Sequence, residues 1–127
     1  MSSGKVILAL DNTTTKLEAF LSDTGTPVVT VIYHIIPAQV KSDTSEYKRA
    51  RTRAALAGTT PTTILAAPVA AGDVIHIDAF YLNNSTGATR TVTVQLDDGT
   101  NNDILVEQEL LDTETLSFDS EEGFRVM

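Results

Sequence analysis

The 127-residue chain contains no cysteine and no tryptophan, and only 6% of its residues are aromatic. Without cysteine, the sequence excludes a disulfide framework, thiol catalysis and a zinc site with cysteine ligands. It also lacks a run of about 18 apolar residues, which excludes a transmembrane helix. The first ten residues, MSSGKVILAL, do not have the charged, apolar and small-residue order of a secretory signal, so we expect no cleaved leader.

Basic residues are scarce as well, since 9 Lys and Arg stand against 17 Asp and Glu and give a formal net charge of −8. This charge opposes binding to phosphate backbones, so a nucleic-acid-binding protein is disfavoured unless the charge is sharply segregated. Hydrophobic residues make up 42% of the chain, enough for one modest core. We therefore expect a single domain over residues 1–127, with neither nucleic acid nor membrane as a partner.

Threonine is the most unusual component, because it occurs 19 times, mostly in short tracts or at alternate positions. Its β-branched side chain fits an exposed strand face better than a helix. Short segments of alternating polarity recur at intervals of about 8–12 residues, separated by turn-forming residues. They predict strands over residues 5–10, 15–21, 28–36, 62–66, 73–83, 89–96, 104–111, 114–119 and 124–127.

This series of short strands is typical of an all-β fold, and we expect a single β-sandwich that is jelly-roll-like. Residues 28–36 are the most apolar segment and are expected to form a central strand, buried within the sandwich or between subunits. In residues 73–83, alternation is expected to place one set of side chains on a common face, namely Ile75, Ile77, Ala79 and Tyr81.

Residues 37–57 interrupt the series because they show no apolar alternation, and they are long for a connection inside a compact domain. We interpret them as a long basic arm, extended or partly helical. Asp43 and Glu46 could form a capping box, and Gly58 could end a helix. The apolar residues of the segment would give such a helix only a thin face, so both conformations remain open.

Charge is segregated along the chain. Residues 41–53 hold five of the nine basic side chains and two acids, whereas residues 97–127 hold ten acids and one arginine. Complementary charges of this kind can steer assembly and select its orientation, although two ordinary solvated faces are the alternative. The side chains expected to make contacts with a partner or between subunits are Tyr47, Lys48, Arg49, Arg51 and Arg53.

The two histidines, His34 and His76, are the first candidates for chemistry. His76 and Asp78 are expected to share a strand face, where the carboxylate could orient the imidazole. Neither a serine in a Gly-x-Ser-x-Gly setting nor a third metal ligand at a diagnostic spacing accompanies them. We therefore interpret both histidines as sheet or interface residues and expect no catalytic residue, no metal site and no cofactor.

Acidic segments are the second candidates. Residues 97–103 have the composition of a calcium loop, but Gly99 stands third instead of sixth and strands flank the segment, which favours a polar hairpin loop. Glu107 and Glu109 share a strand face, as the two carboxylates of a retaining glycosidase could. In so acidic a segment such pairs arise by composition, and the few aromatic residues offer little for a sugar-binding cleft.

The order of motifs resembles that of small β-sandwich structural proteins of tailed bacteriophages. The motifs are GTTPTTILAAP (58–68), FYLNN (80–84), DDG (97–99), DIL (103–105), ETL (114–116) and EEGFRV (121–126), with KLE (16–18) and VIY (31–33) nearer the start. The resemblance covers most of the chain, and residues 37–57 match least.

The resemblance implies a virion component without enzymatic activity. Our first hypothesis is a capsid decoration, or cement, protein that binds as a homotrimer at capsomer junctions and stabilises the shell. The arm residues would then contact the major capsid protein, another virion protein or a second subunit. The alternative is a tail, neck or baseplate protein of the same fold that anchors a fibre, and a small carbohydrate-binding or hydrolase domain is the third hypothesis.

Overall fold

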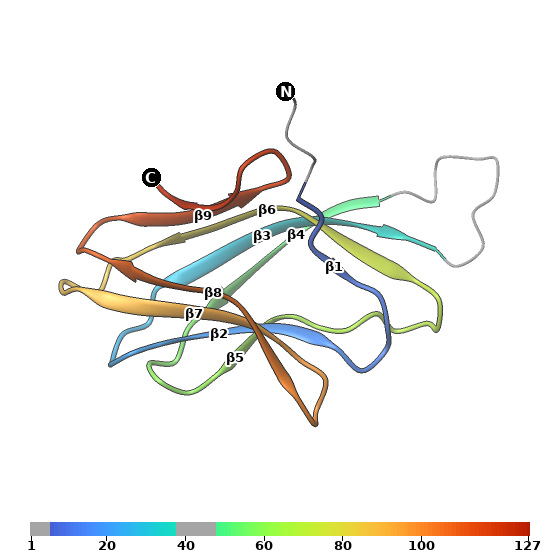
Figure 1. Ribbon diagram of the computed structural model, residues 1–127, viewed down its shortest axis with the longest axis horizontal. Helices are drawn as coiled ribbons and strands as arrows, with labels where there is room; N and C mark the ends of the chain where they lie inside the picture. The colour runs from blue at the N-terminus through green and yellow to red at the C-terminus, as the bar shows by residue number, and fades with distance from the viewer. Residues whose placement is uncertain (1–5, 38–47) are drawn as a thin grey trace.

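A computed structural model describes residues 6–37 and 48–127 (Figure 1). All regular structure in these ranges is β-strand, and none of it forms a helix long and apolar enough to cross a membrane. The strands are β1 (Ala9–Leu10), β2 (Lys16–Leu21), β3 (Val28–Ile36), β4 (Lys48–Ala55), β5 (Thr62–Leu65), β6 (Val74–Asn83), β7 (Arg90–Asp97), β8 (Asn102–Leu110), β9 (Thr115–Asp119) and β10 (Gly123–Val126).

The strands form two antiparallel sheets that lie in two layers (Figure 1). A six-stranded sheet has the order β10-β9-β6-β3-β4, with β1 also paired to β6, and a four-stranded sheet has the order β5-β2-β7-β8. The predicted β-sandwich is therefore confirmed, whereas this strand order does not confirm the jelly-roll connectivity. Apart from β1, which is shorter than expected, the predicted strands agree with the observed ones to within two residues.

One cluster of buried apolar side chains fills the space between the sheets. The four-stranded sheet contributes Leu17, Ala19 and Leu21 from β2, with Val92 and Val94 from β7. Burying each larger side chain contributes about 1.5–3 kcal/mol. The six-stranded sheet supplies the opposite wall, with Val29, Val31, Phe80, Leu82, Leu116 and Phe118.

A β-bulge interrupts β6 next to β3. Asp78 is the extra residue, since Ile77 and Ala79 pair with consecutive residues of β3. Ile77 before the bulge and Phe80 and Leu82 after it all face the core. The expectation that Ala79 and Tyr81 share a face with Ile77 was therefore wrong, because a bulge shifts the alternation by one residue.

Residues 48–55 of the expected arm form β4, an edge strand that pairs with β3 along its whole length. The helical alternative was wrong for these residues, and the extended alternative holds only as a strand paired within its own domain. The physical reason is an alternation of arginine with alanine and threonine, which presents small side chains inward without an apolar pattern. Asp43, Glu46 and Tyr47 lie outside the described residues, and Gly58 follows β4 in a turn with φ +57°.

Candidate functional site

The outward face of the six-stranded sheet carries a row of three arginines on β4, which we call the arginine row: Arg49, Arg51 and Arg53. All three are exposed, and the residues between them are half-buried. In the register with β3, the three arginines lie opposite His34, Ile32 and Thr30. Residues directly opposite each other in an antiparallel pair point to the same face, so the guanidinium groups point away from the core.

Two residues of the expected contact set are placed less fully. Tyr47 lies outside the described residues, and for Lys48 only the backbone, opposite Ile35 of β3, is described. The structure therefore brings Arg49, Arg51 and Arg53 together as one set.

A second cluster on the same face joins three strands. The His34 Nδ1 atom of β3 lies 2.9 and 3.0 Å from the two carboxylate oxygens of Asp78 of β6. The Arg49 Nε atom lies 3.8 Å from Asp78 Oδ2, and the rings of His34 and His76 have centroids 5.2 Å apart. The bulge positions Asp78 for these contacts, since it turns an additional side chain toward β3.

The sequence-based prediction of which histidine Asp78 contacts was wrong. His76, two residues away on the same strand, was the expected partner, but the carboxylate contacts His34 of the neighbouring strand. Residues two apart on a strand are separated by about 6.6 Å, whereas cross-strand neighbours approach more closely. Only the register of β3 against β6 identifies this pair, and nothing in the local sequence signals it.

A pocket of about 240 Å³ adjoins the cluster, and its lining includes His76, Asp78 and Ser120 together with Val6 and Ile7. The contact with Asp78 occupies Nδ1 of the His34 imidazole. No hydrogen bond joins the Ser120 side chain to either imidazole, so the described residues assemble no nucleophile and base pair here. Nor does any group of three or more His, Asp and Glu side chains in residues 6–37 and 48–127 come close enough to hold a metal ion.

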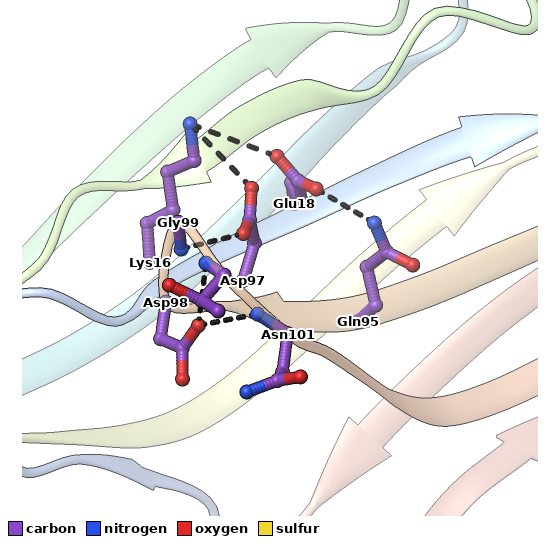
Figure 2. Close-up of polar contacts among 8 residues, drawn as sticks. Lys16, Glu18, Gln95, Asp97, Asp98, Gly99 and Asn101 are labelled. Atoms are coloured by element: carbon purple, nitrogen blue, oxygen red, sulfur yellow. Dashed lines mark hydrogen bonds and ion pairs between the residues drawn. The ribbon is translucent and has the colours of Figure 1, made fainter.

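The outward face of the four-stranded sheet holds a buried carboxylate, shown in Figure 2. Glu18 is 4% exposed, and its Oε1 accepts a 2.6 Å hydrogen bond from Nε2 of Gln95, which is also 4% exposed. The Lys16 Nζ atom lies 3.8 Å from Glu18 Oε2 and 3.9 Å from Asp97 Oδ2. Because both oxygens of Glu18 contact side chains of the same sheet, this group contributes to the fold and is closed to a ligand.

The turn between β7 and β8 has carboxylates that cap its own backbone (Figure 2). Asp97 Oδ1 accepts a hydrogen bond from the Gly99 N–H, and Asp98 Oδ1 accepts bonds from the N–H groups of Asn101 and Thr100. The Asn101 and Thr100 N–H groups lower the pKa of Asp98 because they stabilise its charged form. The hairpin interpretation of residues 97–103 is confirmed.

β8 carries a short acidic counterpart to the arginine row. Glu107 and Glu109 are exposed and lie opposite Thr93 and Thr91 of β7, so both point outward from the four-stranded sheet, and they share a strand face as the sequence predicted. β8 is an edge strand of this sheet, as β4 is of the other. We call Glu107 and Glu109 the glutamate pair.

A further pocket, of about 340 Å³, lies between the sheets at one end of the sandwich. Its walls are mainly apolar and include Ile35, Leu65, Pro68 and Ile75. It is separate from the arginine row, the histidine cluster and the glutamate pair, and it gathers no group of ionisable side chains.

Comparison of the chain with protein-family models, with curated proteins and with solved structures finds no match. The likeness to phage structural proteins therefore stays a hypothesis that rests on the sequence motifs.

Proposed function

We propose that the protein is a non-enzymatic structural component of a tailed-phage particle, a capsid decoration protein that binds as a homo-oligomer at capsomer junctions and stabilises the shell. The observation that carries the proposal is the arginine row. Three exposed guanidinium groups stand two residues apart on a strand whose other edge is paired along its length with β3. A contact surface held in this way loses little backbone entropy when it binds.

The chemistry of the row suits a protein partner. Guanidinium groups bind carboxylates in a bidentate geometry and are enriched at interfaces, where they often contribute a large share of the binding energy. Among residues 6–37 and 48–127, the carboxylate that forms an ion pair with the row is Asp78, which lies 3.8 Å from Arg49 and is already bound to His34. An acidic surface on a neighbouring protein therefore fits the row.

Copy number separates decoration from the alternative role in a tail, neck or baseplate. A decoration protein repeats with the symmetry of the shell, so we expect on the order of hundreds of copies per particle, whereas a tail component is present in a few dozen at most. The measurement is the band intensity of the protein relative to the major capsid protein in purified particles of the phage that encodes it. A low ratio would favour the tail, neck or baseplate role.

The contact role of the row is tested by rebinding to particles that lack the protein. Replacing both Arg51 and Arg53 by Ala should reduce occupancy at least about tenfold, and the loss should be greatest at low salt. Arg125→Ala is the matched control, because Arg125 lies on the outward face of the same sheet, on β10 at the opposite edge. Occupancy that is unchanged by the double substitution would contradict the proposal.

A further inference from the structure

Two long strands end the two sheets with one side unpaired. Within residues 6–37 and 48–127, β4 ends the six-stranded sheet with 8 residues, and β8 ends the four-stranded sheet with 9. An unpaired edge exposes a row of backbone N–H and C=O groups that can pair with another strand, and proteins usually shorten, cover or charge such edges. Both edges here are charged, but with opposite signs.

The charges on the two edges match in spacing and in direction. On β4 the arginines recur every second residue, and on β8 the glutamates do the same, with both sets pointing outward from their sheets. β4 contains no acidic residue, and β8 contains no basic one. Opposite charges placed directly across an antiparallel pair are stabilising, and like charges are destabilising.

We propose that β4 of one copy pairs with β8 of a second copy, so that the six-stranded sheet of the first continues into the four-stranded sheet of the second. In an antiparallel register, Arg51 and Arg53 lie opposite Glu109 and Glu107. A shift by two residues instead places Arg49 and Arg51 opposite the same glutamates. Both registers form two cross-strand ion pairs on the outward face and keep the inward faces of the two strands aligned.

Pairing of an edge with its own copy is disfavoured. Two β4 strands would place arginine opposite arginine, and two β8 strands would place glutamate opposite glutamate. The contact is therefore head-to-tail, because each copy uses β4 toward one neighbour and β8 toward the other. Such a contact closes into a ring when the rotation between copies permits, and a ring of three would be the trimer expected from the sequence.

This inference deepens the proposed function, on whose homo-oligomeric binding it rests, by naming the two surfaces that meet. The test is sedimentation velocity on the purified full chain at about 50 mM and about 500 mM salt. We expect association that increases with protein concentration and weakens at the higher salt.

Charge reversal identifies the edges. Arg51→Glu with Arg53→Glu makes both edges acidic, and Glu107→Arg with Glu109→Arg makes both edges basic. Each double variant alone should associate at least about tenfold more weakly than the wild type, because every edge then meets a like charge. An equimolar mixture of the two variants should associate again in pairs of unlike variants, since a ring of three would keep one like-charged contact, and the chain that carries all four substitutions should associate as the wild type does. Rescue of this kind also shows that the variants are folded.

The control carries the same change of charge elsewhere. Asp11→Arg with Glu121→Arg alters two exposed carboxylates in loops away from β4 and β8, and it should associate like the wild type. A monomeric wild type at low salt overturns the inference, as does association that both reversals leave unchanged or that the mixture fails to restore. If the isolated chain is monomeric but occupies capsids through the arginine row, only the edge pairing fails. If it assembles through these edges but is absent from particles, only the proposed function fails.

Discussion

On the outward face of the four-stranded sheet a carboxylate is buried, whereas on the outward face of the six-stranded sheet three guanidinium groups stand in solvent. Glu18 is 4% exposed and bound to Gln95 and Lys16, while the side chain of Arg49 is 76% exposed and its Nε atom lies 3.8 Å from Asp78. A buried charge must be satisfied by its own fold, because desolvation costs several kcal/mol otherwise. An exposed charge on a fixed strand is free to meet a partner, so we assign stability to the first set and binding to the second.

The largest effect on stability is expected where the buried carboxylate loses its donor. Gln95→Leu removes the 2.6 Å hydrogen bond to Glu18 and leaves the charge buried, which should cost about 2–3 kcal/mol in the free energy of unfolding. Urea denaturation of the Gln95→Leu variant and of the wild type measures this cost. The double variant Glu18→Leu, Gln95→Leu should recover most of the loss, because it removes both polar partners. A single variant as stable as the wild type would show that the carboxylate does not depend on Gln95.

A smaller effect is expected in the histidine cluster of the six-stranded sheet, where the groups are half-buried. A double-mutant cycle on His34 and Asp78, with Ala at each position, should give a coupling free energy of about 1 kcal/mol. The same cycle on His76 and Asp78, the pair expected from the sequence, should give a coupling within about 0.3–0.5 kcal/mol of zero. Thermal or urea unfolding measures both, and a larger coupling for the second pair would contradict the observed contact.

The same comparison shows what the sequence could predict. β7 was predicted because apolar and polar residues alternate in it, as a half-buried strand requires, and β3 was predicted because it is the most apolar segment of the chain. β4 was missed because its inward positions hold Ala and Thr, which are too small and too polar to produce an apolar pattern. The signal that could have predicted β4 is Arg at every second position, because large charged and small side chains then alternate along the segment.

The contacts within the two faces depend on register, which one strand alone cannot specify. The burial of Glu18 requires Thr63 of β5 and Gln95 of β7 on its two sides, and these come from distant parts of the chain. The His34 contact requires the bulge at Asp78, whose sequence looks like regular alternation. Sequence periodicity therefore predicted the elements and the segregation of charge, and the pairing of strands decided which side chains meet.

The arginine row should hardly affect stability. Arg51→Ala with Arg53→Ala should change the free energy of unfolding by less than about 0.5 kcal/mol, because exposed side chains away from caps and cores contribute little. The same variant should lose association and particle binding, so binding and stability should respond differently to one substitution. Unfolding measured in urea at low protein concentration is the appropriate experiment, since association would otherwise add to the apparent stability. A large loss of stability in the monomer would mean that the row serves the fold.

The smallest effect is expected at the β7–β8 turn, where the exposed Asp98 accepts two backbone hydrogen bonds. The pKa of Asp98 lies below its ordinary value of 3.8 in the folded protein, so its charged form favours the folded state. That contribution is fully present above pH 3.8 and is lost as the pH falls through the folded pKa. Asp98→Asn keeps an acceptor oxygen but removes the titration, so the wild type should be slightly more stable than the variant at pH 7, and the difference should shrink toward pH 3. Urea unfolding at both pH values measures it. A difference that grows on acidification would mean that the negative charge of Asp98 destabilises the turn. The carboxylates of the four-stranded sheet that bind groups of their own fold could then not all be assigned to stability.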